Sequence, residues 1–189
     1  MIWVALGALA VAAYAWYVTL ITRRNKVREA MSSVDVHLTQ RHDLVPALVA
    51  LADRYMQHER DLLIEVTRLR EAATHAGGRS AGELGARFDV EAQLGAHVGQ
   101  VFARLEAYPD LKSDGPLRDA QAAWVEVEAQ ITAARRFYNA AVNQLNNAAQ
   151  MFPGSLIAGA VGVEPMPYFE AAAAAREVPS VGAVAGPHS

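Results

Sequence analysis

Cysteine is absent from the 189-residue sequence, which excludes disulfide bonds and thiol chemistry. Aromatic residues make up only 7% of the chain and runs of Val, Ile, Thr and Tyr are scarce, whereas alanine is abundant. This composition favours helices over a sheet. The net charge of −3 and the scattered basic residues give no basis for nucleic-acid binding. We therefore expect an all-α protein that does not bind nucleic acid.

The first 22 residues, MIWVALGALAVAAYAWYVTLIT, contain no charged side chain. About 20 apolar residues cross the hydrocarbon core as a helix, so residues 1–22 form a predicted transmembrane helix. Trp3 at one end and Trp16 with Tyr17 near the other suit the two membrane interfaces. A core helix buried in protein is the alternative. The basic cluster comes after the apolar run, which disfavours a cleaved signal peptide and, by the positive-inside rule, places the N-terminus outside and the body in the cytoplasm; it comprises Arg23, Arg24, Lys26 and Arg28.

Apolar residues recur in alternating steps of four and three from Val27 to Ala73, which predicts a long helix with one buried stripe. Pro46 removes one backbone donor and crowds the preceding turn. We therefore expect a kink or break near His42 to Pro46, and a break there would give four bundle helices instead of three.

Two further amphipathic helices follow. Ser80 and Glu83 match a capping box, and the helix after them is predicted to run to about Tyr108. The last helix is predicted over 117–152, with Phe152 on its apolar seam and Pro153 as its stop.

The chain thus divides into a transmembrane helix over residues 1–22 and an up-and-down antiparallel helical bundle over 23–155. Residues 156–176 mix apolar and small side chains, and they either fold back on the bundle or contact the membrane or a partner. Residues 177–189, rich in Pro, Gly and small residues, are an expected disordered tail.

Charged residues interrupt the apolar seam of every predicted helix. An unpaired charge in a core costs several kcal/mol, so these groups should meet opposite charges across the bundle or lie where the seam opens to water. The alternative is that they reach solvent along the flank of a helix, and Phe88 could then replace Arg87 in the core. The six charges, three of each sign, are Arg41, Glu59, Arg87, Glu91, Glu128 and Arg135.

Four of the five asparagines lie within nine residues of the last predicted helix. Asparagine is a mediocre helix former because its amide competes for the backbone, so the cluster needs a reason. With Tyr138 on the seam, Asn139 and Asn146 follow at its edge, and we expect them to bond a neighbouring helix or the returning C-terminal segment. Asn143 and Asn147 are expected to face solvent.

Motifs for metal, phosphate or nucleophilic chemistry are missing. The six histidines form no pair at i, i+3 or i, i+4 spacing and no Glu-x-x-His motif. The glycine-rich stretches lack the lysine of a phosphate-binding loop. We expect no catalytic residue, no metal and no cofactor.

Seven stretches, in order, resemble the LemA family of bacterial membrane proteins: QRHDLVPALV, YMQHE, RLREA, YPDLKS, EAQITAARRFYNAAVNQLN, MFPGSLIAG and PMPYFEA. The resemblance implies a single-pass protein of the bacterial inner membrane, with its N-terminus outside, a four-helix cytoplasmic bundle and no established activity. Two departures are Leu145, where an aromatic often precedes the second asparagine, and the last 14 residues, which lack the usual hydrophobic ending. Family residues carry over at Arg41, Leu44, Pro46, Glu59, Arg70, Tyr108, Pro109, Leu111, Glu128, Arg135, Tyr138, Asn139, Asn146, Phe152 and Pro153.

The leading functional hypothesis is a non-enzymatic docking or scaffolding module that contacts the lipid bilayer and an unidentified protein partner. One alternative is an enzyme or ligand sensor with a charged interhelical cleft around Arg41, Glu59, Glu128 and Arg135. Another is a homo-oligomer that organises membrane. The structural or interaction candidates are Arg41, Glu59, Glu91, Glu128, Arg135, Tyr138, Asn139, Asn146, Phe152 and Pro153.

Overall fold

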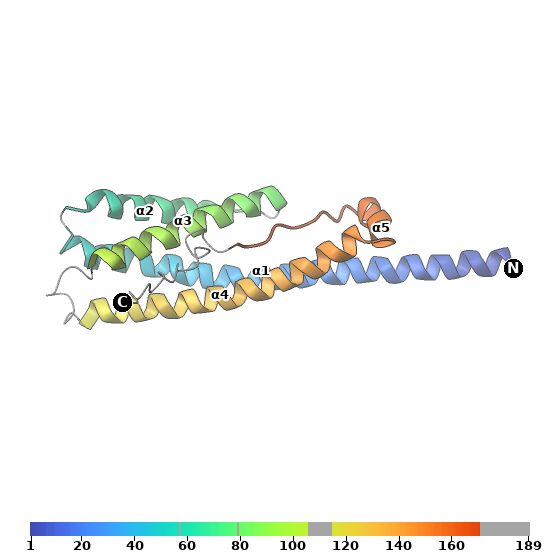
Figure 1. Cartoon of the computed structure of the whole chain (residues 1–189), viewed down its shortest axis with the longest axis horizontal. Coiled ribbons are helices and arrows are strands. Elements are labelled where there is room, and N and C mark those ends of the chain that lie inside the picture. The colour runs from blue at the N-terminus through green and yellow to red at the C-terminus, as the bar shows by residue number, and fades with distance from the viewer. Residues whose placement is uncertain (57, 79, 106–114, 171–189) are drawn as a thin grey trace, which may run out of the picture.

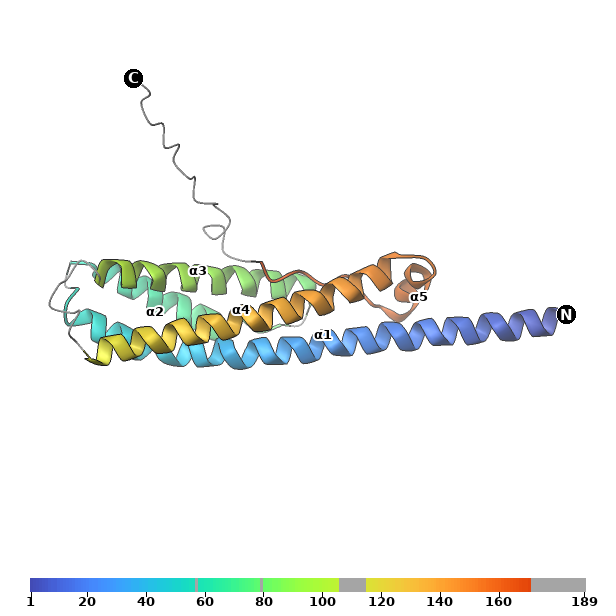
Figure 2. The same cartoon turned by 60° about the horizontal axis from the view of Figure 1, so that its bottom comes forward.

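The computed structural model describes residues 1–56, 58–78, 80–105 and 115–170. The secondary-structure elements in these ranges are all helices, as the composition predicted. Successive long helices run in opposite directions, with α4 antiparallel to α1 and the α2–α3 pair lying along the half of α1 that is remote from the N-terminus (Figures 1 and 2). The helices are α1 (Ile2–Asp53), α2 (Arg60–His75), α3 (Ala81–Leu105), α4 (Gly115–Gln150) and α5 (Gly154–Val161).

The apolar run and the first bundle helix are one continuous helix. α1 contains 52 residues, or about 78 Å at about 1.5 Å per residue, and it passes through Pro46 without interruption. Of the kink or break predicted near His42 to Pro46, the break is wrong, because the chain leaves the helix only after Asp53. The reason lies on α2, where Arg70 Nε donates to the carbonyl oxygen of His42 at 2.9 Å. That carbonyl would otherwise have bonded the N–H that Pro46 lacks.

The predicted stripe holds along α1 and then shifts. Val27, Val34, Leu38, Val45, Leu48 and Ala52 are buried as expected. Beyond Asp53 the turn changes the register, so that Met56 and Leu63 are buried in place of Tyr55 and Leu62. The prediction of one helix from Val27 to Ala73 is thus wrong. Two helices joined by a turn contain the buried stripe.

The capping box at the start of α3 is confirmed. The Ser80 backbone N–H donates to Glu83 Oε2 at 3.1 Å, and the Glu83 N–H points to Ser80 Oγ at 3.4 Å. Phe88 occupies the core with 5% exposure, while its neighbour Arg87 is half-buried. The predicted helix end near Tyr108 lies outside the described residues.

The end of α4 differs from the prediction. α4 ends at Gln150, and Phe152, expected on the seam, is 79% exposed. A further helix, α5, begins directly after Pro153. Gly154 permits this tight turn, because a Cβ on that residue would lie 1.9 Å from the carbonyl oxygen of Ala148. Gly162, in the left-handed region at φ +64°, ends α5.

One helix in the described part of the chain, α1, is long and apolar enough to cross a membrane. Only 6% of its apolar window is buried, which disfavours the core-helix alternative and supports membrane anchoring. Two apolar clusters form the core. One joins residues 20–38 of α1 to the start of α3, to α4, to α5 and to Phe169. The other joins the remote half of α1 to α2, to the rest of α3 and to the start of α4.

Candidate functional site

A group of buried charges lies at the level where one apolar cluster gives way to the other. Arg41 of α1 points its guanidinium at Glu91 of α3 and Glu128 of α4. Its Nη1 lies 3.0 Å from Glu128 Oε1, and its Nη2 donates to the Glu91 backbone carbonyl at 3.0 Å and also bonds the Glu91 carboxylate. We call this group, with His42, the charged junction. It links three helices in one set of bonds.

Both carboxylate oxygens of Glu91 are bonded. His42 Nε2 donates to Oε1 at 2.9 Å while Arg41 binds Oε2. The Glu91 side chain is 0% exposed and that of Arg41 only 4%, whereas that of Glu128 is 37% exposed. The arrangement is paired and mostly dry, with water reaching it on the Glu128 side.

Opposing effects act on the pKa of Glu91. Burial alone would raise it, but the hydrogen bond from His42 and the positive charges of Arg41 and His42 outweigh burial, so the pKa is lowered. Glu91 is thereby held ionised at neutral pH. A carboxylate fixed in this way acts as a permanent partner for Arg41 and is poorly placed to exchange protons with a ligand.

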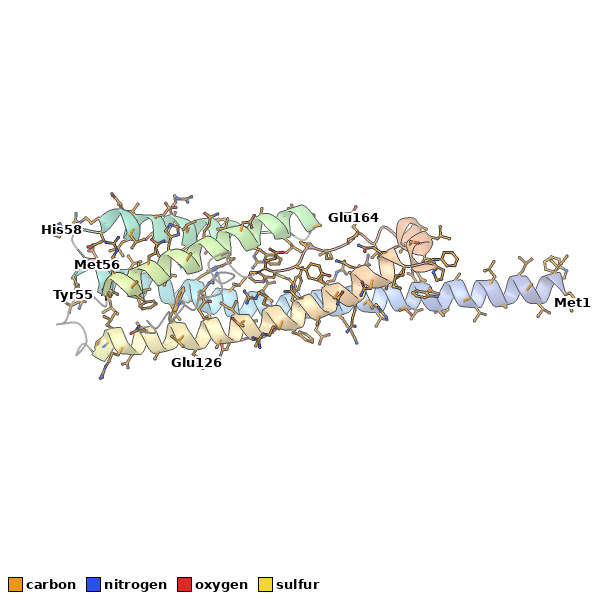
Figure 3. The ribbon with its side chains drawn as sticks, in the orientation of Figure 1. Met1, Tyr55, Met56, His58, Glu126 and Glu164 are labelled. Atoms are coloured by element: carbon orange, nitrogen blue, oxygen red, sulfur yellow. The ribbon has the colours of Figure 1, made fainter. Side chains whose placement is uncertain are left out.

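Two members of the predicted charged cleft lie elsewhere. Glu59 precedes the first residue of α2, in the turn where Met56 and His58 mark the remote end of the bundle (Figure 3). Arg135 lies with its guanidinium carbon 6.0 Å from the centre of the Phe169 ring. The structure thus brings Arg41 and Glu128 together and places the other two at separate sites. Arg87 pairs with Asp35 of α1 at 2.8 Å.

A second group of polar contacts fastens the chain after α5 to α4. Residues 163–170, here called the C-terminal strap, run back along the bundle (Figure 1). Asn139 Nδ2 donates to the Phe169 carbonyl at 3.0 Å, and its Oδ1 accepts from the Phe169 N–H at 2.8 Å. Asn146 makes the same pair of bonds with the Met166 backbone, both at 2.9 Å. Of the two partners expected for these amides, the returning segment is the one observed.

The spacing of the two asparagines matches the strap. Asn139 and Asn146 are separated by about 10.5 Å along the helix, at about 1.5 Å per residue. Met166 and Phe169 are separated by about 10 Å if the strap is extended, at about 3.3 Å per residue. Each amide therefore faces a backbone group of the strap running in the opposite direction, and the strap is held in one register.

Aromatic packing completes the attachment. The Phe169 ring stacks on Phe88 of α3, with centroids 4.2 Å apart and planes at 3°, and Phe88 meets Tyr138 edge-on at 5.7 Å. Tyr138 donates its hydroxyl hydrogen to the Pro167 carbonyl at 3.0 Å, and burial raises its pKa to about 12. The strap therefore joins α3 to α4.

The other predicted residues of this region have simpler surroundings. Asn143 and Asn147 are exposed as expected and bond to each other at 3.1 Å. Phe152 is exposed, and Pro153 is the cap residue of α5. The remaining residues of the predicted C-terminal segment, 171–176, and the tail, 177–189, lie outside the described residues.

Sequence reasoning missed one member of the charged junction and the residue that bonds its backbone carbonyl. His42 appeared only as the start of an expected kink, and Arg70 only as a family residue. Pro46 was the available signal, since a proline inside a helix leaves the carbonyl four residues earlier in need of another donor.

The surface beside the strap is hollowed. A cavity of about 590 Å³ lies between α1, the start of α3 and the strap, and Arg24, Arg28, Asp35, Arg87 and Glu164 are among its lining residues. No group of three or more potential metal ligands occurs among the described residues.

Comparison with known proteins gives one family and two relatives. The LemA family model matches residues 30–182, which is more than half of the chain. Magnetosome proteins MamQ 1 and MamQ 2 of Paramagnetospirillum magneticum strain AMB-1 are each 23% identical over 175 residues, covering 82% of this chain. The alignment covers 64% of the length of each relative. The match to the family model includes both the charged junction and the strap, and the chain belongs to the LemA family.

Proposed function

We propose that this protein is a membrane-anchored, non-enzymatic docking or scaffolding module, with its bundle at the cytoplasmic face of the bacterial inner membrane. The observation that carries the proposal is the continuity of α1. The same helix supplies the apolar run of the candidate membrane span and the central helix of the bundle. In the described chain no linker separates the candidate membrane span from the bundle. The bundle is therefore held at a fixed distance from the membrane.

The length of α1 sets how far the bundle extends from the membrane. From Arg23, the first charged residue, to Asp53 the helix rises about 45 Å, at about 1.5 Å per residue. α2 and α4 pack along this part and stiffen it, and α3 packs on α2 (Figure 2). A partner bound to the bundle would be held at a defined distance from the bilayer. The basic cluster after residue 22 supports the cytoplasmic orientation through the positive-inside rule.

The charged junction supports a structural role for the seam charges. Arg41 and His42 are buried and both bond the buried Glu91, and Glu128 pairs with Arg41. A charge cluster of this kind fixes which helices meet and in which register. A catalytic or sensing cleft made from Arg41, Glu59, Glu128 and Arg135 would require groups that the structure places apart.

The test is affinity capture from solubilised bacterial membranes. The full chain would be compared with a variant that keeps the anchor and the basic cluster but lacks the bundle. The proposal expects a defined set of proteins that is recovered with the full chain and lost with the variant. Identical protein lists from the two baits would overturn it. Recovery of a second copy of the chain alone would instead favour the homo-oligomer alternative.

The cavity beside the strap favours a second candidate function, the binding of a small polar ligand. Its lining carries both positive and negative side chains, among them Arg24, Arg87 and Glu164. Ala81→Trp would fill the cavity, and Ala86→Trp on the exposed side of the same helix is the matched control. Native mass spectrometry should then find a co-purified small molecule that only Ala81→Trp removes. If the unmodified protein and both variants carried the same bound small molecule, or if none of them carried one, this candidate would be excluded.

A further inference from the structure

The turn between α4 and α5 exposes large apolar side chains that the bundle leaves uncovered. Met151 is 65% exposed, Phe152 79% and Leu156 70%. The sequence around them is uncharged from Phe137 to Val163. A soluble domain would place such side chains in its core, so their exposure needs a partner that is itself apolar.

The turn lies beside the apolar part of α1. Arg23, the first charged residue after the apolar run, donates from Nη1 to the Gln144 carbonyl at 2.7 Å. From that contact α4 continues toward the N-terminal end of α1, and α5 lies next to the apolar run (Figures 1 and 2). A Cβ on Gly154 would lie 3.4 Å from the Trp16 ring, and Leu20 shares a buried cluster with Ala158.

These contacts fix the depth of the turn relative to the membrane boundary. Trp16 precedes Arg23 by about 10 Å along the helix, at about 1.5 Å per residue. The headgroup layer on each side of a bilayer is only about 5 to 8 Å thick, which is half the difference between the full thickness and the hydrocarbon core. With Arg23 at the headgroups, the residues packed against Trp16 lie at the edge of the acyl chains.

Three backbone N–H groups of the turn are already bonded within the protein. Polar backbone groups in hydrocarbon must be bonded within the protein. Met151 N–H donates to Asn147 O at 3.0 Å, Ser155 N–H to Met151 O at 3.1 Å and Leu156 N–H to Pro153 O at 3.2 Å. Pro153 has no N–H to satisfy. The turn can therefore leave water without exposing these donors.

We propose that the segment from Met151 to Leu156 inserts into the acyl-chain edge of the bundle-side leaflet, next to α1. The inference rests on the membrane anchoring in the proposed function and adds a second lipid contact to it. The apolar surface contacts lipid, because it lies beside the candidate span at the same depth in the membrane. A second lipid contact beside α1 restrains the tilt of α1 in the bilayer, which a single spanning helix leaves less constrained. It would thus set the angle at which the bundle leaves the membrane.

The absence of cysteine makes a depth measurement direct. Single cysteines introduced as Leu156→Cys and Phe152→Cys would carry an environment-sensitive fluorophore, in the full chain reconstituted into phosphatidylcholine–phosphatidylglycerol vesicles. Both sites are exposed, so labelling should not disturb the fold. Leu9→Cys in the apolar run and Val125→Cys near the other end of α4, exposed at 67% and 63%, are the controls. Lipids with a nitroxide on the acyl chain, shallow or deep, are the quenchers.

The expected result is a loss of fluorescence at Leu156→Cys and Phe152→Cys of the same order as at Leu9→Cys, stronger with the shallow nitroxide, and none at Val125→Cys. Quenching at Leu9→Cys without quenching at either turn site would overturn the inference and leave the anchor intact. A turn that covers a protein partner instead of lipid would give that result. An unquenched Leu9→Cys would refute the anchor, and the inference would fall with it.

Discussion

Asn139 and Phe169 exchange two hydrogen bonds, in which the asparagine amide donates to the Phe169 carbonyl and accepts from the Phe169 N–H. A helix side chain thereby does for the strap what a neighbouring β-strand would do, since it satisfies both backbone groups of one residue. Asn146 repeats the arrangement at Met166. The pair explains why a helix tolerates asparagines that are poor for its own stability.

The first prediction concerns these amides. Asn139→Ala and Asn146→Ala should each lower the free energy of unfolding by about 1 to 2 kcal/mol, because each leaves backbone groups of the strap without their partners. Asn143→Ala and Asn147→Ala should be neutral or slightly stabilising, since both residues are exposed and alanine is the better helix former. Urea unfolding of the four variants in detergent would measure the difference. Equal effects at all four positions would contradict the role of the strap.

The second prediction concerns Arg70 and Pro46. Arg70→Met should destabilise the protein by about 1 to 2 kcal/mol, because the His42 carbonyl loses its donor. In a Pro46→Ala background the same change should cost less, because the introduced alanine supplies the backbone N–H that proline lacks. A double-mutant cycle of unfolding free energies measures this coupling. Additive effects would show that Arg70 does not compensate for the proline.

The third prediction concerns the acid stability that Glu91 confers. Its pKa is lowered in the folded protein, so its contribution is present above the ordinary glutamate value of about 4.3 and is lost as the pH falls through the folded-state pKa. Glu91→Gln should cost about 3 kcal/mol at neutral pH by removing the charge that faces Arg41. The difference from the unmodified protein should shrink below about pH 4.3.

Stability measured against pH for the two proteins checks this prediction. A constant difference across the acid range would mean that the ionisation of Glu91 does not contribute. Glu65, an exposed glutamate bonded to Arg68, offers the matched control, because Glu65→Gln should change stability little at any pH.

The fourth prediction uses two glycines of α3. A Cβ on Gly95 would lie 3.3 Å from Arg41 Nη1, whereas nothing lies within 4 Å of a Cβ on Gly99. Gly99→Ala should stabilise the protein by up to about 1 kcal/mol through helix propensity. Gly95→Ala should give no such stabilisation or should destabilise the protein. Arg41 is held on both sides by Glu91 and Glu128, so it cannot move away from the added Cβ. Thermal melts of the two variants give the comparison, and equal stabilisation would show that the charged junction is loosely packed.

Local patterns predicted a large part of this structure. The buried stripe from Val27 to Ala52 and the capping box at Ser80 depend on neighbours in sequence, and both were foreseen. Asn139 and Asn146 were placed at the seam edge by helical periodicity alone. Periodicity does not identify the distant partner, because a period says which side a residue faces and not what lies there.

Three features depend on contacts that no local pattern contains. α1 continues through Pro46 because Arg70, on another helix, bonds the carbonyl that proline leaves free. Phe152 was assigned to the seam by periodicity, but the chain turns before it to begin α5. Glu59 and Arg135 have the same seam pattern as Arg41, yet only the latter faces Glu91 across the bundle.

The accessibility of single cysteines to a membrane-impermeant maleimide tests whether α1 holds the bundle at the cytoplasmic face of the membrane. Ile2→Cys and Val125→Cys are both at exposed residues, the first at the start of α1 and the second in the first third of α4. The start of α4 lies at the end of the bundle remote from the N-terminus (Figure 1). In intact spheroplasts, Ile2→Cys should be labelled and Val125→Cys should react only after permeabilisation. Labelling of Val125→Cys in intact spheroplasts would contradict the claim.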